Sequence, residues 1–393
     1  MTQAHPSQGR ARKPLLAGAA LAFTLVIGGC SEQANVSTDS ISSDPEAVTF
    51  YSTYGYQRGA SWIIPLRIWV HEQPNALKAL VGDAARDIIA GRAEIESLTD
   101  AEEQRFDYRT AHFVTDAESR EQVIFVFDDD PLAEQFQIIA DQEPVTSDLN
   151  GLIEGELLLS DATARRLLAA QNAEHGWLRF HTVSEDHTGT GRIRLVPPVG
   201  LSVISDIDDT IKVTDIPAGE VTVLKRTFFE EFIAAPCMAA TYRDFGADTA
   251  FHYVSGGPWQ LYAPLARFLF SETSGFPPGS FHMKNVRANP FESESYDDVW
   301  QLIASGSKEA TYAQKIGQIS TLMAHFPERS YILIGDSGEK DPEIFAEIRR
   351  QLPNQIRQIR IRDVVNAATA APGRLSDMVV IDPAAACAIR GEL

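Results

Sequence analysis

The sequence predicts an α/β protein, a parallel sheet with helices on its faces, preceded by a β-rich, sandwich-like domain. Two observations predict this fold class. In the second half of the chain, short apolar runs alternate with stretches that are apolar at helical spacing, which is typical of a parallel sheet covered by helices. In the first half, apolar runs are separated by polar turns, as in an antiparallel β domain.

The predicted organisation has four parts. A signal peptide occupies 1–29, a lipidated cysteine with a flexible tether 30–46, the β-rich domain 47–199 and the α/β domain 200–393. The boundary between the last two is marked by Pro197-Pro198 and Gly200, because these residues cannot continue a central strand.

The leader has the pattern of a secretory signal peptide. Three basic residues precede an apolar run, 15–29, that is too short to span a bilayer. The run ends in LVIGGC, residues 25–30, which resembles the lipobox of bacterial lipoproteins. We therefore expect a lipid anchor on Cys30 and a location in the bacterial cell envelope, at the periplasmic face of the outer membrane. An ordinary cleaved signal is the alternative.

The β-rich half is predicted to hold six strands and one helix. Each strand is a short run rich in β-branched and aromatic residues. The predicted strands are Val48–Tyr56, Trp62–His71, Gln122–Phe127, Gly151–Leu159, Trp177–Val183 and Arg192–Val196, and the helix is Asn75–Ala90. This half shows no catalytic constellation, since its acidic triplet 128–130 before Pro131 is typical of a solvated turn.

The α/β half is predicted to alternate strands with helices. The predicted strands are Leu201–Ser205, Phe251–Val254, Tyr331–Ile334 and Gln358–Ile361, and the helices are Pro258–Phe270, Thr311–Phe326 and Pro342–Leu352. Each strand ends in polar or acidic residues. Because ligands bind at the carboxyl ends of parallel strands, a site is expected at that edge of the sheet.

Charge and cysteine content limit the partners. The formal net charge of −20 argues against nucleic acid as a partner and against attachment to anionic lipid through a basic patch. Apart from Cys30, the chain has Cys237 and Cys387. These two could form a disulfide in an oxidising compartment or stay as free thiols, and the sequence leaves both readings open.

The motif DIDDT, residues 206–210, follows the first strand of the α/β half. One of its carboxylates, Asp206, could attack phosphorus, while Asp208 could give a proton to the leaving oxygen. Two acids so close call for a divalent cation, and oxygen ligands around a phosphate favour magnesium. Asp336, at the end of the third strand, supplies another carboxylate. Asp341 either supplies one more or caps the helix that starts at Pro342.

Two further features complete the candidate site. Ser255 follows the second strand and precedes two glycines, so its hydroxyl and the exposed backbone amides could hold phosphoryl oxygens. The basic group that offsets the charge on phosphate is Lys308 or Lys315. The residues alone leave both lysines open.

The order of these features resembles a known superfamily. DxDxT, a serine after a strand, a lysine and GDxxxxD, over Asp206–Asp341, resemble the four motifs of the haloacid dehalogenase (HAD) phosphohydrolases. Within that superfamily, the segments 203–211, 253–259 and 335–344 resemble the App1-type phosphatidate phosphatases, which are related to the catalytic module of lipins. The resemblance covers nearly all of 200–365 and, more loosely, the β-rich half.

The resemblance implies a HAD-like Rossmannoid sheet, Mg²⁺ as cofactor and phosphatidate or a related anionic phospholipid as substrate. The implied roles are Asp206 as nucleophile, Asp208 as general acid and base, Ser255 as phosphate ligand, Lys315 as the motif lysine, and Asp206, Asp208, Asp336 and Asp341 around the metal. Two positions depart from the family, since Gln314 replaces a usual histidine and Glu339 a usual glutamine. The intervals between motifs are short, so we expect a small cap or none.

Two alternatives stay open at this point. The motifs specify phosphoryl transfer but not the alcohol, so the substrate could be a soluble phosphomonoester. The chain could also be a non-catalytic envelope module that binds phosphate headgroups. The first reading, a lipid phosphatase held at the membrane by its anchor, is favoured because an open site suits a membrane-embedded substrate.

Overall fold

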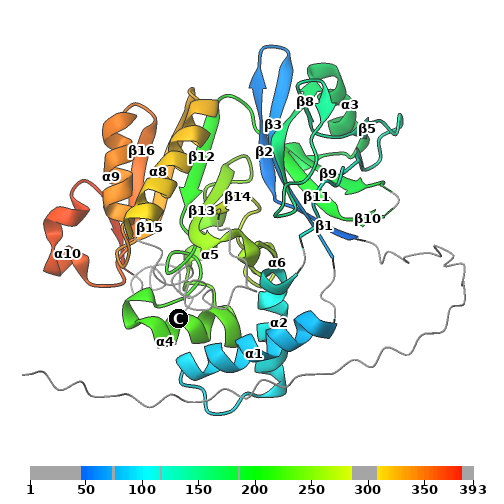
Figure 1. Ribbon diagram of the computed structural model, residues 1–393. Coiled ribbons are helices and arrows are strands. Elements are labelled where there is room, and N and C mark those ends of the chain that lie inside the picture. Colours follow the sequence, from blue (N-terminus) through cyan, green and yellow to red (C-terminus); the bar gives the residue numbers. More distant parts are fainter. Residues whose placement is uncertain (1–45, 73–75, 116, 185, 286–307, 383–393) are drawn as a thin grey trace, which may run out of the picture. The chain divides into compact units, whose positions relative to one another are not determined.

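The computed structural model describes residues 46–72, 76–115, 117–184, 186–285 and 308–382 (Figure 1). The predicted signal peptide, the lipobox with Cys30, the tether up to residue 45, and Cys387 lie outside these ranges. Residues Ser43–Leu393 belong to one compact unit. Within the described ranges, no helix has both the length and the apolar character needed to cross a membrane.

A nine-stranded sheet forms the β-rich half, in the order β10-β1-β3-β2-β11-β9-β4-β5 with β8 paired to β3. Its strands are β1 Glu46–Phe50, β2 Thr53–Arg58, β3 Ser61–His71, β4 Phe125–Phe127, β5 Gln135–Phe136, β8 Leu152–Ser160, β9 Trp177–Thr182, β10 His187–Thr188 and β11 Thr190–Leu195. The short strands β6 Ile139–Ala140 and β7 Glu143–Pro144 pair separately.

This sheet curls over its own apolar core. Phe50 in β1 and Phe180 in β9 lie far apart in the strand order, yet their ring centroids are 4.8 Å apart. Both rings belong to one core cluster with Ile68 and Ile193. All six predicted strands are present, although the single predicted run Val48–Tyr56 is divided into β1 and β2. The expected antiparallel arrangement is only partly correct, because β1 pairs with β10 and β2 with β11 in parallel.

The helices of this half are α1 Ala76–Arg92, α2 Asp100–Val114 and α3 Asp161–Ala170, with the short turn η1 Glu174–Gly176. Only α1 was predicted from the sequence. Helix α2 begins with a capping box, because the Thr99 hydroxyl accepts from the Glu102 amide while Glu102 Oε2 accepts from the Thr99 amide at 2.8 Å. Helix α3 has a simple N-cap, because the Ser160 hydroxyl accepts from the Thr163 amide at 3.0 Å.

A six-stranded parallel sheet forms the α/β half, in the order β14-β13-β12-β15-β16-β17. Its strands are β12 Gly200–Ser205, β13 Ala250–Pro258, β14 Ser280–Lys284, β15 Arg329–Asp336, β16 Ile356–Arg362 and β17 Val379–Ile381. The chain runs from β12 outward to β14 and then returns to β15 on the other side of β12. The carboxyl ends of β12 and β15 therefore flank the switch point where ligands bind in such sheets.

Helices cover both faces of the parallel sheet (Figure 1). Their bounds are η2 Ile216–Ala218, α4 Glu220–Leu224, η3 Lys225–Phe229, α5 Met238–Arg243, η4 Trp259–Leu261, α6 Tyr262–Leu269, α8 Lys308–His325, α9 Asp341–Gln351, α10 Ala367–Ala370 and η5 Pro372–Leu375. Ile204 packs with residues of α8 and α9, whereas its neighbour Val203 packs with α4, η3, α5 and α6. Both faces are buried, which explains why these strands read as continuous apolar runs.

The four predicted strands and three predicted helices of this half are all present, and β14, β17 and the short helices between 216 and 243 were not predicted. The two large sheets divide between Leu195 and Gly200, at the predicted boundary. Whether the halves are independent domains stays a prediction, because both lie in one compact unit.

The β-rich half contacts the α/β half through specific polar groups. Ser52 donates from its amide to the Tyr262 hydroxyl at 2.9 Å and from its own hydroxyl to the Gly279 carbonyl at 2.8 Å. In α2, the buried Arg109 donates to the Thr227 carbonyl at 2.9 Å, and its Cζ lies 3.6 Å from the centroid of the Phe232 ring. The β-rich half thus contacts both the segment between β12 and β13 and the segment from α6 to β14.

Candidate active site

Asp206 follows β12 directly and is fixed by its backbone and both carboxylate oxygens. Its amide donates to the Ile334 carbonyl of β15 at 2.9 Å. Oδ2 accepts from the Thr210 hydroxyl at 3.1 Å and Oδ1 from Lys315 Nζ at 2.7 Å. The side chain that the DxDxT motif singled out is therefore oriented at the sheet's switch point.

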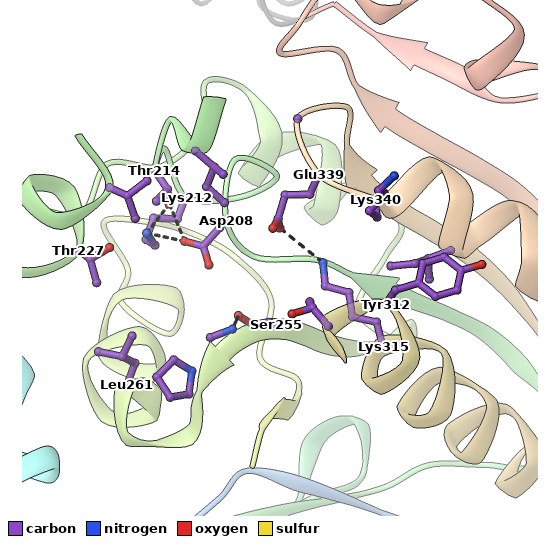
Figure 2. A pocket seen from close by; sticks show the side chains of 18 of the residues that line it. Asp208, Lys212, Thr214, Thr227, Ser255, Leu261, Tyr312, Lys315, Glu339 and Lys340 are labelled. Carbon is purple, nitrogen blue, oxygen red and sulfur yellow. Dashed lines mark hydrogen bonds and ion pairs between the residues drawn. The ribbon is translucent and has the colours of Figure 1, made fainter. Parts of the chain in front are cut away.

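Lys315, in α8, reaches the same place and is almost completely buried. Its Nζ lies 2.8 Å from Asp341 Oδ1 and 3.8 Å from Glu339 Oε2, and Figure 2 draws the contact with Glu339. The side chain of Lys308 is not among those described. Of the two predicted lysines, Lys315 is thus the one whose contacts with the carboxylates are established.

Asp336 ends β15 with one oxygen bound and the other without a partner. Oδ1 accepts from the amides of Gly338 at 2.6 Å and Glu339 at 3.2 Å. Oδ2 is buried and has no hydrogen-bond partner among the described residues. One oxygen each from Asp206, Asp336 and Glu339 lie within 4.8 Å of one another. This all-oxygen set, with an unpaired buried atom, fits a magnesium ion.

The predicted metal ligands divide into two sets. Asp206 and Asp336 belong to the three-carboxylate group, and Glu339, which sequence reasoning noted only as a departure from the family, is its third member. Asp341 instead accepts from Lys315 through Oδ1 and from the Asp336 amide through Oδ2 at 3.3 Å. A Cβ at residue 335 would lie 2.3 Å from Asp341 Oδ2, so Gly335 is what allows this approach. Asp341 therefore orients the group.

Asp208 lies outside that group and pairs with a lysine that sequence reasoning missed. Lys212 Nζ is 2.7 Å from Asp208 Oδ1, and the Thr214 hydroxyl donates to the same oxygen at 2.5 Å (Figure 2). Burial raises the pKa of Asp208, but Lys212 and Thr214 outweigh burial and hold it below its usual value. The available signal was a lysine two residues after the DxDxT motif.

Asp209 was also given no role, and it shapes the turn. Its backbone adopts a positive φ of 54°. Its carboxylate accepts from three successive amides, those of Thr214 at 2.9 Å, Asp215 at 2.5 Å and Ile216 at 2.6 Å. The side chain thereby ties the loop that carries Lys212 and Thr214 back onto the motif, and this loop positions Asp208.

Negative charge is concentrated in the site. Burial raises the pKa values of Asp206 and Asp336 well above the usual aspartate value, and nearby carboxylates, Asp341 above all, raise them further. Lys315 acts in the opposite sense on both. Burial likewise raises the pKa of Glu339 to about 7, against the effect of Lys315. Four carboxyl groups thus surround one ammonium, and a bound cation would relieve their repulsion.

Ser255 lies in β13, completely buried, beside the two glycines. Its hydroxyl accepts from the Gly257 amide at 2.9 Å, and its carbonyl accepts from Gln314 Nε2 at 3.2 Å. A Cβ at residue 256 would lie 2.8 Å from Thr311 Cγ2, so Gly256 is needed for α8 to approach this loop. The structure therefore brings Ser255 next to Gln314 of α8, the residue that directly precedes Lys315.

Part of this group lines a cavity of about 360 Å³ (Figure 2), whereas Asp206, Asp336 and Asp341 are buried and do not line it. Its polar end is lined by Asp208, Lys212, Ser255, Lys315 and Glu339. Its apolar wall comes mostly from the segment between β12 and β13 and from η4 and α6. The apolar lining residues are Ile216, Val223, Phe232, Pro258, Leu261 and Leu265, together with Ile344 of α9. The cavity is thus suited to a ligand with one charged end and one apolar part.

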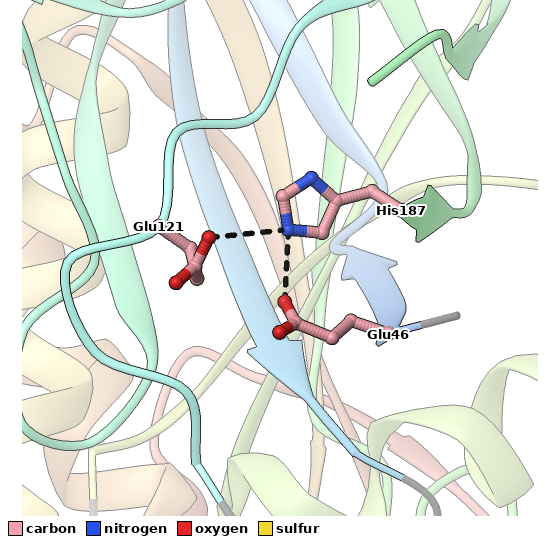
Figure 3. Close-up of side chains that lie close together, drawn as sticks. All are labelled: Glu46, Glu121 and His187. Atoms are coloured by element: carbon pink, nitrogen blue, oxygen red, sulfur yellow. Dashed lines mark hydrogen bonds and ion pairs between the residues drawn. The ribbon is translucent and has the colours of Figure 1, made fainter. Parts of the chain in front are cut away.

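The described residues hold a second group with metal-ligand chemistry, far along the chain from the first (Figure 3). His187 Nε2 lies 2.9 Å from Glu46 Oε2 and 3.8 Å from Glu121 Oε2. None of the predicted site residues belongs to it. The buried imidazole is hydrogen-bonded to Glu46, which ties the start of β1 to β10.

Comparison with known proteins places the α/β half in a family. Residues 201–363 match the family model described as the catalytic domain of phosphatidate phosphatase APP1. The chain is 32% identical to the phosphatidate phosphatase APP1 of Saccharomyces cerevisiae over 182 residues, which are 45% of this chain and 28% of that protein. It is 28% identical to an uncharacterized protein of Schizosaccharomyces pombe over 198 residues, 48% of this chain and 29% of that protein.

The matched regions span less than a third of both relatives. A solved carbohydrate esterase aligns over 81% of this chain and 88% of its own, but with 11% identity and a TM-score of 0.20 the alignment supports no conclusion. The matched residues contain the DIDDT motif, Ser255, Lys315 and Asp341. Residues 201–363 thus match the catalytic domain of the App1-type family, which the motifs predicted.

Proposed function

We propose that this chain is a magnesium-dependent phosphatase of the HAD type that removes the phosphate from phosphatidate or a closely related lipid phosphomonoester. The observation that carries the proposal is the cavity next to Asp208, Ser255 and Lys315, which joins a charged end to an apolar wall. A soluble phosphomonoester would leave that wall without a partner. The name of the yeast relative, a phosphatidate phosphatase, supports the same substrate class.

In the proposed reaction an oxygen of Asp206 attacks phosphorus, and the bond from phosphorus to the glycerol oxygen breaks. Asp208 gives a proton to that oxygen, so diacylglycerol leaves and an aspartyl phosphate is formed. Water then attacks the phosphorus, Asp208 takes up a proton from it, and phosphate and the free Asp206 carboxylate are released. The 2.7 Å contact with Lys315 orients Asp206 for the attack.

The lowered pKa of Asp208 fits this role only in the presence of substrate. Without it, Lys212 holds the carboxylate ionised. The negative charge of an arriving phosphate would raise the pKa of Asp208 and draw Lys212 toward itself. A substrate would thus prepare its own proton donor, and Lys212 would contact phosphoryl oxygens from the side of the cavity opposite Lys315.

Asp206, Asp336 and Glu339 are the residues that would hold the magnesium ion. Support comes from the buried, unpaired Oδ2 of Asp336 and from the excess of carboxylates over ammonium groups. A bound Mg²⁺ would supply positive charge that offsets the phosphoryl oxygens.

The proposed location is the bacterial cell envelope, with Cys30 as the lipidated residue. The leader and the lipobox-like segment 25–30 support it. Cys237 is disulfide-bonded, which fits an oxidising compartment outside the cytoplasm. A tether of about fifteen residues would keep the cavity near the headgroup layer, so that effective concentration replaces the electrostatic attraction that an acidic protein lacks.

A substrate panel tests this function. Purified protein would be assayed for phosphate release from phosphatidate in mixed micelles, from glycerol 3-phosphate and from p-nitrophenyl phosphate, with magnesium or with a chelator. We expect magnesium-dependent release, with kcat/KM highest for phosphatidate. A preference for glycerol 3-phosphate would establish the soluble-substrate alternative. Absence of release from all three would establish a non-catalytic binding protein.

A further inference from the structure

A second cavity, of about 770 Å³, lies between the β-rich half and the α/β half. It is bounded by β9, β11 and the η1 turn on one side and by the segments 243–251 and 270–278 on the other. It shares no lining residue with the first cavity. Its arginines are Arg179, Arg192, Arg194 and Arg243, its acids are Glu174 and Glu272, and its aromatic residues include Trp177 and Phe270. Positive charge therefore gathers here in a chain whose formal charge is −20.

Arg192 is the arginine of this cavity whose guanidinium has neither a carbonyl nor a carboxylate partner among the described residues. Its backbone belongs to the ladder between β11 and β9, but within the described ranges its side chain makes no hydrogen bond and no carboxylate oxygen lies within 4.0 Å of its guanidinium. Its contacts are aromatic, since Cζ lies 3.5 Å from the ring centroid of Phe270 and 5.6 Å from that of Trp177. Burial lowers the pKa of Arg192, and no carboxylate offsets this effect. A half-buried guanidinium without an anion is costly, and a bound oxyanion would offset that cost.

The other arginines are already engaged. Arg194 donates to the carbonyls of His175 at 2.9 Å, Thr249 at 2.6 Å and Ala247 at 3.2 Å, so it adds charge and joins the two halves. Arg179 lies 3.6 Å from Asp128 and 3.8 Å from Asp129. Arg243 donates to the Gly275 carbonyl at 2.9 Å. Arg243 is exposed, so Arg192 is the partly buried arginine of this cavity whose guanidinium donors have no acceptor among the described residues.

We propose that this cavity binds an organic oxyanion, a phosphate or phosphonate group carried on an apolar body, with Arg192 as its main charged contact. The guanidinium fork suits two phosphoryl oxygens, and Trp177 and Phe270 offer an apolar surface beside it. The volume lies in the range of ordinary small-ligand sites. The ligand is either a soluble organic phosphate or the headgroup of a phospholipid, and the site is independent of the reaction at the first cavity.

Trp177 provides a local readout for the test. Phenylphosphonate, which has no hydrolysable ester, would be titrated into the full-length protein in the presence of a chelator while tryptophan fluorescence is followed. Vesicles of phosphatidylcholine with and without phosphatidate form the second arm, read by co-sedimentation. If the protein binds phenylphosphonate saturably but does not bind the vesicles, the ligand is a soluble organic phosphate. If it binds vesicles only when they contain phosphatidate, and this binding needs Arg192, the ligand is a phospholipid headgroup.

Two matched variants decide the role of Arg192. Arg192→Gln is expected to weaken binding about tenfold or more, the usual contribution of a charge-assisted hydrogen bond. Arg179→Gln removes an arginine from the same wall, but one whose charge Asp128 and Asp129 already offset, and is expected to change affinity by less than about twofold. Trp177→Phe tests the fluorescence readout itself. This variant should bind phenylphosphonate with wild-type affinity, measured by calorimetry, but should lose the fluorescence change.

Folding of each variant would be checked by thermal unfolding, and Arg192→Lys, which keeps the charge, would stand in if Arg192→Gln were unstable. Arg192→Lys is expected to retain more affinity than Arg192→Gln. Equal affinity of the wild type and Arg192→Gln for both probes would overturn the proposal. So would the absence of saturable binding of either probe by the wild-type protein. Neither result depends on phosphatase activity, because magnesium is withheld.

Discussion

The ammonium nitrogen of Lys315 lies 2.7 Å from Oδ1 of Asp206, although 109 residues separate the two in the sequence. The contact joins the helix α8 to the end of β12 across the switch point of the parallel sheet. Asp341 shares the same nitrogen at 2.8 Å. The lysine is therefore the centre about which the acidic side chains of the site are arranged.

Lys315→Met is expected to lower phosphatase activity about 100-fold or more, because the proposed nucleophile loses the cation that orients it. The variant also leaves two buried carboxylates, Asp206 and Asp341, without their common partner, so its melting temperature should fall. Lys308→Met makes the same charge change at the start of the same helix. Comparable loss of activity in Lys308→Met and Lys315→Met would contradict the assignment of Lys315.

Magnesium affinity is expected to depend on Glu339 and Asp336. Glu339→Gln removes one charge from the three-carboxylate group, and we expect about tenfold weaker magnesium binding by calorimetry, with a larger loss for Asp336→Asn. Glu343→Gln is the matched control, because Glu343 lines the same cavity but pairs with Arg374 at 2.6 Å and lies outside the group. Unchanged magnesium affinity in Glu339→Gln would exclude it as a ligand.

The apolar wall of the cavity is expected to select for lipid. Phe232→Ser removes a ring that lines the wall, and its KM for phosphatidate should rise about tenfold while kcat/KM for p-nitrophenyl phosphate changes little. Phe268→Ser is the control, since its ring packs 5.7 Å from that of Phe232 but does not line the cavity. Equal effects of Phe232→Ser on both substrates would indicate general damage and refute a role in lipid selection.

Acid sensitivity is expected from buried histidines, of which His112 is the clearest case. Burial lowers its pKa from 6.5 to about 4. Between these values the unfolded chain binds a proton that the folded protein does not, so the free energy of unfolding falls as the pH falls through this window. When the pH is lowered from about 7.5 to about 5, the free energy of unfolding of His112→Phe should fall by about 2 kcal/mol less than that of the wild type, as measured by urea unfolding. An identical pH dependence would refute this.

Much of the site could be predicted from the sequence because its residues stand at strand ends. Parallel strands bring their carboxyl ends to one edge, so the runs before Asp206, Ser255 and Asp336 were enough to place these three side chains together. Lys315 required the spacing that the family resemblance supplied. The structure brings all of these residues to the lining or the immediate surroundings of one cavity.

What the sequence did not reveal depends on conformation and on contacts between distant segments. Lys212 meets Asp208 because Asp209, with a φ of 54°, turns the chain and binds the next loop through three amides. No hydrophobic periodicity signals such a turn. The packing of Arg109 on Phe232 likewise arises from tertiary structure alone. The helices α2 and α3 were a different case, since their capping residues Thr99 and Ser160 were present as signals and were overlooked.

The division of labour between the first two aspartates tests the central claim most directly. Asp206→Asn and Asp208→Asn would be assayed side by side on phosphatidate and on p-nitrophenyl phosphate, whose leaving group needs no proton. Uncatalysed hydrolysis of phosphomonoesters is so slow that such enzymes supply up to ~10²¹-fold acceleration, so loss of the nucleophile should leave activity near background. We expect Asp206→Asn to lose both activities equally. Asp208→Asn should retain a larger fraction of wild-type activity on p-nitrophenyl phosphate than on phosphatidate. Substantial turnover of both substrates by Asp206→Asn would show that Asp206 is not the nucleophile and would contradict the proposed mechanism.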